Sequence, residues 1–424
     1  MVDSHPRLAY LVSQYPAISH TFINREIQQL EAWGIGVHPF SMRHGQILPG
    51  ATDFEKSQLA DTYCIHGQSL LTKIGAQFLV GLQHPLGYLK GLLYALALQK
   101  GRLKETLWAL FHFLEAAILY REMRRRGLTH IHVHFANSEA YIALYAHYAF
   151  GVGFSFTLHG PDAFYNTELG NLREKIRRAA FVICISNFAR GQAMRLSQTR
   201  DFGKFHIVHC GVDSARYRPF PKPPPSADQP LQIVCTGRLT ATKGQILLAM
   251  ACAGLAEKGR LFHCKFIGDG DHAEALRLWI AERGLQDCIQ LTGPLPQDGV
   301  LEALKSAHLF VLPSFAEGVP VVLMEAMSMG IPCISTRVGG IAELIENGRN
   351  GWLIHSGDPD TLLAVLDRLC EDPSVLAPMG EAARATIQDQ FEVGKNAQRL
   401  AAIFQEHLKP GCTTRHLSPG PAPG

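Results

Sequence analysis

The chain has 424 residues, of which 47% are hydrophobic and 18% are charged, and its formal net charge at pH 7 is +3. That length exceeds one ordinary hydrophobic core and suits two α/β domains. The ten cysteines occur singly, without a C-x-x-C pair, which argues against a zinc ribbon or a dithiol redox motif and favours a reducing, cytoplasmic compartment. The small net charge and the lack of a recognised binding motif argue against a nucleic-acid partner.

Strand-like and helical runs alternate along the first half of the chain, which predicts an α/β fold with parallel sheets. The first residues lack a basic start, a long apolar segment and a cleavage site, so we expect no signal peptide. The uncharged window 140–161 contains two histidines and a Gly-Val-Gly turn, which predicts helix, turn and strand rather than a membrane span. The candidate strands of this half are residues 7–16, 37–43, 130–135, 154–160, 181–186 and 204–212, and two clear helices are residues 21–33 and 175–180.

Residues 70–126 are basic and rich in leucine and aromatic residues. They carry nine lysines and arginines against three glutamates, an excess as large as that of residues 1–215 together. Two interpretations stand. The segment is either a set of helices with a solvated cationic face, or a surface that dips into anionic lipid, where each basic side chain adds about 1 kcal/mol.

A proline-rich stretch, residues 217–230, has few large apolar residues and is predicted to be an extended, exposed linker. After it the βα alternation resumes, and a helix at 391–408 follows the second domain. We therefore expect an N-terminal domain at 1–216, a C-terminal domain at 231–390 and a disordered tail at 411–424. The candidate strands of the second half are residues 231–239, 263–270, 288–293, 308–314, 331–340 and 351–355.

Two carboxylates stand eight positions apart in the stretch PSFAEGVPVVLMEAMSMG. Pro320 is suited to the first position of a helix, because the N–H that it lacks has no partner there. Glu317 then lies just before the helix, where the backbone N–H groups favour anions, and Glu325 follows a little over one turn into it. Such a strand–turn–helix unit can hold a phosphorylated ligand, although a buried βα unit with two ordinary acids is the simpler interpretation.

The stretch LQIVCTGRLTATKG, residues 231–244, places two cations after a strand. Gly237 allows a tight turn, and Arg238 and Lys243 follow five residues apart. Fixed cations at this place would stabilise the negative charge that grows on a departing diphosphate. The alternative is two surface cations on a βα loop.

With EGVP, LMEAM, GIPCI and the VGG at 338–340, these patterns resemble the donor site of retaining glycosyltransferases of family 4, whose GT-B fold has two Rossmann-like domains. The resemblance covers the chain up to about residue 405 and is most specific from 231 to 355, and it implies that the helix at 391–408 crosses back onto the first domain. It implies that Glu317 faces the transferred sugar, that Glu325 holds the ribose, and that Gly237, Arg238 and Lys243 bind the donor diphosphate. It also implies that Gly318, Val319 and Pro320 lie beside the donor sugar.

Two turns of the second half match the family's nucleotide-binding turns. FIGDGD contains Gly268 and Gly270, where backbone can approach the ligand, and TGPL contains Pro294 and Leu295, which in the family run beside the base. The D-x-D triplets at 269–271 and 358–360 could hold a metal ion, but the first lies in a strand-to-helix turn and the second has no supporting context. We therefore expect no metal.

In the first half, TLHGPD follows a strand, and ligands bind outside the carboxyl ends of parallel strands. The family carries a histidine here that faces the donor sugar, which implies that role for His159 as a catalytic residue and suggests Asp162 beside it. The alternating histidines of THIHVHF would point to one face of a strand and could suggest zinc. A buried core strand is the commoner explanation, with His134 the member nearest the site.

Near the start, PAISHTFI matches a loop that faces the acceptor in exopolysaccharide members of the family. It contains Ser19, His20 and Thr21. Relatives carry glutamate where this chain has His20, so the acceptor role does not transfer directly. Ser19 and Thr21 can instead cap the following helix.

The resemblance implies a glycosyltransferase of the colanic acid or exopolysaccharide type, which moves a sugar from a nucleoside diphosphate to a hydroxyl of a lipid-linked glycan with retention of configuration. UDP is favoured over GDP, and no cofactor beyond this substrate is expected. A lipid-linked acceptor favours peripheral contact of residues 70–126 with the inner face of the plasma membrane. The alternatives are a GT-B sugar-nucleotide epimerase or phosphorylase and a non-catalytic glycan- or nucleotide-binding protein.

Overall fold

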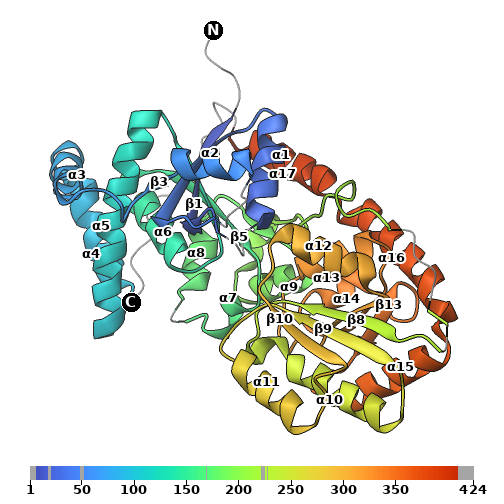
Figure 1. The fold of residues 1–424 in the computed structure, drawn as a ribbon. Helices are drawn as coiled ribbons and strands as arrows, with labels where there is room; N and C mark the ends of the chain where they lie inside the picture. Colours follow the sequence, from blue (N-terminus) through green and yellow to red (C-terminus); the bar gives the residue numbers. More distant parts are fainter. Residues whose placement is uncertain are drawn as a thin grey trace. The chain divides into compact units, whose positions relative to one another are not determined.

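The computed structural model describes residues 6–17, 21–47, 52–168, 170–220, 225–226 and 228–408 (Figure 1). The chain divides into two compact units. The first unit contains residues 1–185, 189–208 and 397–424, and the second contains residues 186–188 and 209–396. The acceptor and donor roles of the two domains stay predictions. The predicted loop residues Ser19 and His20 and the predicted tail 411–424 lie outside the described residues, as does the side chain of Thr21.

The first unit is built on a parallel sheet of seven strands in the order β3-β2-β1-β4-β5-β6-β7. Its two-residue strand β3 was not predicted; the other six strands were. The strands are β1 (Arg7–Tyr15), β2 (Gly36–His44), β3 (Tyr63–Cys64), β4 (His130–His134), β5 (Gly153–Leu158), β6 (Val182–Cys184) and β7 (Phe205–Ile207).

Both faces of this sheet are covered by helices, as the alternation along β1 shows. Ala9 and Leu11 belong to one core cluster, whereas Leu8, Tyr10 and Val12 belong to another. Successive side chains of a strand point to opposite faces, so β1 divides the two cores. The helices of this unit are α1 (Thr21–Ala32), α2 (Asp53–Asp61), α3 (Leu70–Gln83), α4 (Pro85–Ala97), α5 (Leu103–Arg126), α6 (Ser138–Phe150), α7 (Asp162–Tyr165), α8 (Leu172–Arg178), η1 (Thr199–Lys204) and most of α9 (Asn187–Arg195) and α17 (Val393–His407).

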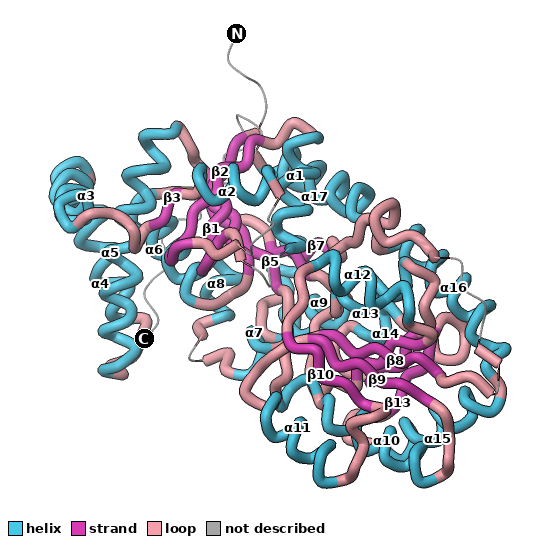
Figure 2. The backbone as a smooth tube through the Cα atoms, viewed as in Figure 1, coloured by secondary structure: helices cyan, strands magenta, loops and turns pink. Residues whose placement is uncertain are grey.

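The second unit has a parallel sheet of six strands in the order β10-β9-β8-β11-β12-β13, with helices on both sides (Figure 2). All six strands were predicted. They are β8 (Leu231–Thr236), β9 (Phe262–Ile267), β10 (Ile289–Gly293), β11 (Leu309–Leu312), β12 (Cys333–Thr336) and β13 (Gly351–Ile354). The helices are η2 (Ala241–Lys243), α10 (Gln245–Glu257), α11 (Ala273–Glu282), α12 (Gln297–Ser306), α13 (Val321–Ser328), α14 (Ile341–Leu344), α15 (Pro359–Glu371), η3 (Pro373–Val375) and α16 (Leu376–Gln390).

Each sheet has the doubly wound order in which the first strand lies next to the fourth of the repeat. The direction of winding reverses between β1 and β4 in the first unit and between β8 and β11 in the second. In open α/β sheets, ligands bind beside such a reversal, at the carboxyl ends of the strands. The fold therefore marks the loops after β8 and β11, and those after β1 and β4, as the places to look for sites.

The proline-rich segment that was predicted to be exposed is partly buried in the second unit. Tyr217 is 1% exposed, and its carbonyl accepts a hydrogen bond from the hydroxyl of Ser328. Pro225 is also buried. The prediction of an exposed segment therefore holds for residues 218–220, 226, 228 and 229 and fails at Tyr217 and Pro225. It failed at Tyr217 because it rested on proline content and overlooked a large aromatic side chain that the core takes in.

Candidate donor site and the edge of the first sheet

The second sheet brings Lys243 and Glu317 together beside its winding reversal. Lys243 ends the short helix η2 after β8, and Glu317 lies in the loop after β11. Lys243 Nζ donates to Glu317 Oε1 at 2.5 Å, and the Ser314 hydroxyl donates to the same oxygen at 2.6 Å. Glu317 is 8% exposed, so this buried carboxylate is paired with a cation and a hydroxyl, as a buried charge requires.

Backbone hydrogen bonds lock the loops around this pair. Phe315 N–H donates to Thr242 O at 2.8 Å, which ties the loop of Glu317 to the loop of Lys243. Gly340 N–H donates to Gly318 O at 2.8 Å, which ties the same loop to the VGG turn after β12. Three loops that follow three neighbouring strands are therefore joined into one edge.

Two glycines are required where these loops approach one another. Gly268 has φ +140°, and a Cβ there would lie 2.0 Å from the carbonyl oxygen of Gly237. Gly339 has φ +55°, and a Cβ there would lie 1.8 Å from the carbonyl oxygen of Glu317. Neither position can hold a side chain without moving the loop on which the predicted diphosphate or sugar contact stands.

Helix α13 begins directly after the Glu317 loop and places Glu325 one turn inside. Pro320, which the sequence predicted as the first residue of the helix, instead occupies the cap position with extended backbone, and the helix begins one residue later. The difference arises because its own carbonyl already accepts from Leu323 N–H at 3.2 Å, which starts the helix at Val321. Glu325 is 7% exposed.

The other predicted donor residues lie on the same edge with different exposure. Arg238 is exposed after β8, and its carbonyl accepts from the Gln245 side chain at 2.8 Å. Pro294 is exposed and Leu295 half-buried after β10, while Gly270 follows β9. The edge thus presents an exposed guanidinium, a half-buried ammonium and two buried carboxylates. This combination can bind an anionic diphosphate and the hydroxyls of a sugar.

In the first unit, a chain of polar side chains runs toward His159 at the end of β5. His134 Nδ1 lies 2.8 Å from His159 Nε2, and His134 Nε2 lies 3.4 Å from Glu26 Oε1. The Tyr10 hydroxyl donates to the same glutamate oxygen at 2.6 Å. Burial, and then the nearby Glu26, raise the pKa of Tyr10, which keeps this hydroxyl protonated as a donor.

His159 is further held by aromatic rings. Phe22 and Phe135 each lie 4.8 Å from its ring, measured between centroids. Asp162, predicted beside it, begins the four-residue helix α7 and is exposed. The structure therefore orients His159 by side chains, whereas Asp162 has no such support among the described residues.

The histidine run forms the buried strand β4, as the core interpretation predicted. His130 and His132 each contact the Ser155 hydroxyl at 2.8 Å, so both point to one face. Burial lowers the pKa of His130 to about 3 and that of His132 well below its usual range. Within the described residues no cluster of three or more His, Cys, Asp or Glu side chains is arranged to hold a metal ion.

Three groups near these edges were not predicted. Ser314 lies three residues before Glu317 in the stretch that the sequence pattern identified, but nothing in that pattern marks its hydroxyl. Glu26 lies in a helix without a distinguishing pattern, so no sequence signal identifies it. The third, Lys175, is fully buried: its Nζ donates to Ala136 O at 2.7 Å and lies 3.6 Å from the Tyr141 ring centre. Burial lowers the pKa of Lys175 to about 7. Its contact holds the loop that follows His134.

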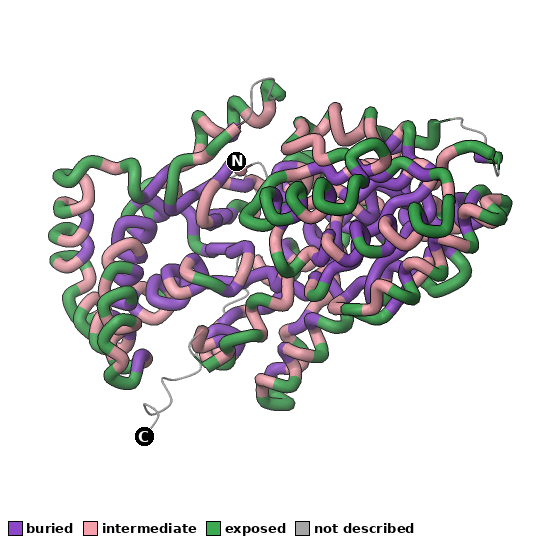
Figure 3. The backbone as a smooth tube through the Cα atoms, turned by 60° about the horizontal axis from the view of Figure 1, so that its bottom comes forward, coloured by how far each residue is buried: buried purple, intermediate pink, exposed green. Residues whose placement is uncertain are grey.

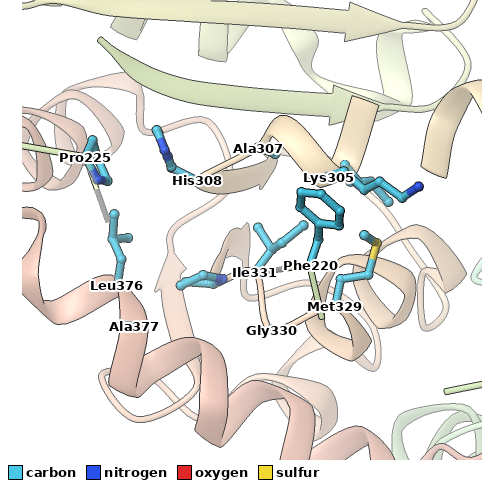
Figure 4. Close-up of a pocket in the computed structure, with 12 residues that line it drawn as sticks. Phe220, Pro225, Lys305, Ala307, His308, Met329, Gly330, Ile331, Leu376 and Ala377 are labelled. Carbon is cyan, nitrogen blue, oxygen red and sulfur yellow. The ribbon is translucent and has the colours of Figure 1, made fainter. Parts of the chain in front are cut away.

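A small cavity of about 100 Å³ lies elsewhere in the second unit. Figure 4 shows Phe220 beside Met329 and Ile331 in its wall. His308 and Ile331 precede β11 and β12, so the cavity is at the amino-terminal edge of the sheet, opposite the predicted donor residues. It contains none of the predicted site residues.

Comparison with known proteins identifies both halves of the chain. Residues 218–386 match the family model of the group 1 glycosyl transferases, and residues 97–216 match that of glycosyltransferase family 4. The structure resembles that of Anabaena Alr3699/HepE in complex with UDP, with a TM-score of 0.70 and 18% identity over 95% of this chain and all of that one. The class is thus that of GT-B folds.

The chain belongs to the glycosyltransferases of the group 1 and family 4 type, as predicted. It is 36% identical over 208 residues to the amylovoran biosynthesis glycosyltransferase AmsK of Erwinia amylovora, a match that covers 48% of this chain and 51% of that protein. It is 34% identical over 242 residues to the colanic acid biosynthesis glycosyltransferase WcaL of Escherichia coli, described as putative, over 55% of this chain and 58% of that protein. The match thus spans little more than half the length of these relatives.

Proposed function

We propose that the protein is a retaining hexosyltransferase, which moves a sugar from a nucleoside diphosphate to a hydroxyl of a lipid-linked glycan in exopolysaccharide biosynthesis. The observation that carries the proposal is the buried Lys243–Glu317–Ser314 cluster beside the winding reversal of the second sheet. It lies where the family places the donor's diphosphate and sugar. The relatives named for amylovoran and colanic acid biosynthesis support the substrate class.

In the proposed reaction the bond from the anomeric carbon to the diphosphate breaks, and a bond from the acceptor oxygen to that carbon forms on the same face. The acceptor's proton passes to the departing diphosphate. Lys243 keeps two N–H groups beyond the one given to Glu317, and Arg238 adds an exposed guanidinium, so both can stabilise the leaving group. Glu317 positions the sugar, and Glu325 binds the ribose.

We propose UDP as the nucleotide, with GDP as the second choice, because the similar Anabaena structure contains UDP. The reaction needs no cofactor beyond the nucleotide sugar. A lipid-linked acceptor would place the enzyme at the cytoplasmic face of the plasma membrane, in peripheral contact with anionic lipid. No helix of the described residues is long and apolar enough to cross a membrane.

The test is thermal unfolding of the purified protein with UDP, GDP, ADP or CMP. A ligand that binds only the folded state raises the midpoint temperature of unfolding. At a concentration about a hundred times its Kd, it adds about 2.7 kcal/mol to the free energy of unfolding. We expect UDP to stabilise the wild type and to lose this effect in an Arg238→Ala, Glu325→Gln variant. If no nucleotide acts at millimolar concentration, or if the variant responds equally, the donor site is wrong.

Turnover separates an enzyme from a binding protein. Glu317→Gln should abolish release of UDP from the UDP-sugar in the presence of acceptor while the shift with UDP persists. If the wild type binds UDP but produces no UDP from the UDP-sugar with any lipid-linked acceptor, the non-catalytic alternative is favoured.

A further inference from the structure

Large apolar side chains are exposed on three neighbouring helices of the first unit. The backbone of these helices lies at the left in Figure 1, and Figure 3 colours the exposed residues of the backbone green. Thirteen of the 21 exposed large hydrophobic side chains among the described residues lie between Leu70 and Phe111. We call this set, on α3, α4 and the first half of α5, the apolar face. Single exposed leucines are ordinary, but a contiguous patch of this extent marks an interaction surface.

Each helix contributes one stripe to the apolar face. On α4, Leu86, Leu89 and Leu93 are 73%, 55% and 57% exposed, at the i, i+3, i+7 spacing of one helix side. The exposed apolar residues 71, 74, 78 and 82 continue this spacing on α3, whereas residues 103, 107 and 111 on α5 follow the i, i+4, i+8 spacing of one helix side. The three helices contact one another, so the three stripes lie on neighbouring helices.

The pattern is inverted relative to an ordinary surface helix, because the small residues face inward. A Cβ on Gly91 would lie 2.4 Å from Ala149 Cβ on α6, and one on Gly87 would lie 2.3 Å from Ala149 O. Ala95, one turn further, is fully buried. Close packing through this small side leaves the leucines of α4 on the opposite, outer side. The exposure is thus built into the helix packing.

The charge around the apolar face has one sign. Residues 70–111 contain five lysines and arginines and a single acid, Glu105. Lys90, Lys100 and Lys104 are exposed and make no ion pair within the part of the chain that the structure describes. By contrast, Arg125 and Arg126 at the end of α5 share the single buried carboxylate of Glu122, which balances one of their two positive charges.

We propose that the apolar face inserts into the boundary between head groups and acyl chains of an anionic membrane. Its leucines and aromatic residues supply most of the binding, and Lys90, Lys100 and Lys104 select anionic lipid. This proposal makes the membrane contact of the proposed function more specific. It depends on the proposed function only for the reason why the protein would bind a membrane. A second copy of the chain is a poorer occupant, because stacking two such faces would bring cations against cations.

The first experiment is co-sedimentation of the full chain with vesicles of phosphatidylcholine alone or mixed with phosphatidylglycerol. Each is measured at about 0.1 M and about 1 M salt, where the screening length falls from about 10 Å to about 3 Å. Insertion predicts binding that persists at high salt and on neutral vesicles, with a preference for anionic ones at low salt. Loss of all binding at high salt would mean adsorption by charge and would overturn the proposal.

Variants assign the binding to the apolar face. Leu86→Ser, Leu89→Ser and Leu93→Ser together should lower vesicle partition by roughly tenfold or more. The matched control is Leu261→Ser with Leu278→Ser, two leucines of the second unit with similar exposure, 54% and 55%, which should bind as the wild type. Equal binding by the α4 variant would overturn the proposal.

A lysine variant and a depth probe complete the test. Lys90→Gln, Lys100→Gln and Lys104→Gln together should lose the preference for anionic vesicles but keep binding to neutral ones. Trp108, 56% exposed, should be quenched by brominated lipid, and Trp108→Phe should remove that signal.

Two further readouts keep this proposal separate from the donor site. The α4 variant should retain its thermal shift with UDP, so a loss of vesicle binding cannot be a folding failure. If the wild type ignores vesicles and light scattering shows a dimer that the α4 variant breaks, a second copy covers the apolar face and the membrane proposal is wrong.

Discussion

The two sheets share a strand order, yet their carboxyl edges are built in different ways. The edge of the second sheet is made of backbone, with loops drawn together at Gly268 and Gly339 until no Cβ fits. The edge of the first sheet is made of side chains: His159 lies between aromatic rings and contacts His134, which in turn lies beside Glu26. An edge built from backbone can bind the diphosphate, which is the part that all nucleoside diphosphate donors share. An edge built from side chains can change its ligand through substitutions.

The largest effect is expected at the ion pair of the backbone edge. Lys243→Ala removes a cation from the proposed leaving group and leaves the buried carboxylate of Glu317 with the hydrogen bond from the Ser314 hydroxyl. Removal of one stabilising group from such a site costs about 100- to 1,000-fold in kcat. Steady-state release of UDP measures this. Lys258→Ala is the control, since Lys258 forms an exposed pair with Asp367 in the same unit. Similar losses in both variants would contradict a role for Lys243 in the chemistry.

The second prediction compares glycines from the two edges. Gly339→Ala should destabilise the protein by about 3 kcal/mol, because its Cβ would overlap Glu317 O and its φ of +55° is unfavourable for alanine. Gly160→Ala, beside His159, should change the free energy of unfolding by less than about 1 kcal/mol, because a Cβ there meets nothing within 4 Å. Urea unfolding measures both. Equal costs would mean that the edges do not differ in this way.

This contrast also explains what could be predicted from sequence. Glycines and prolines at fixed spacing can be recognised in a sequence because the backbone geometry of tight loops requires them. The sequence therefore predicted Gly237, Gly268 and the loop of Glu317. Glu26 lies more than 100 residues from His134 in the chain, and nothing in the helix TFINREIQQLEA distinguishes it from its neighbour Glu31. The inverted amphipathicity of α4 was hidden for a similar reason: leucine content indicates a helix, but only packing decides which side faces inward.

A third prediction uses the buried histidines, which all belong to the first unit among the described residues. Burial lowers the pKa of His130 to about 3, below the ordinary value of about 6.5 that the unfolded chain has. Between these values the unfolded state binds the extra proton, so stability falls as pH falls, by up to about 1.4 kcal/mol per pH unit for each such histidine.

Hydrogen exchange at pH 7 and pH 5 should therefore show protection lost in β4 and β5 before β8 and β11. His130→Gln with His132→Gln should flatten the pH dependence in the first unit. Equal loss of protection in both units would count against this explanation, as would a variant whose stability depends on pH as steeply as that of the wild type.

The smallest effect is expected from Glu26, which acts on His159 only through His134. The carboxylate oxygen of Glu26 faces Nε2 of His134 and favours a proton on that nitrogen. Nδ1 of His134 then accepts a hydrogen bond from Nε2 of His159, which fixes the nitrogen of His159 that carries the proton. Glu26→Gln keeps the shape, removes the charge, and should lower kcat about tenfold with little change in the KM for donor. The matched control is Glu31→Gln on the same helix α1, whose side chain is exposed.

A structural role and a positioning role differ in what else changes. If Glu26 positions His159, the pH profile of kcat should shift in Glu26→Gln, and the loss should disappear in a His159→Gln background, because the two residues act as one unit. If the losses multiply in the double variant while the pH profile is unmoved, Glu26 serves the packing of α1 on β1 alone. In that case side chains would not position His159 at the edge of the first sheet. The two edges would then differ only in the tight glycine contacts of the second sheet.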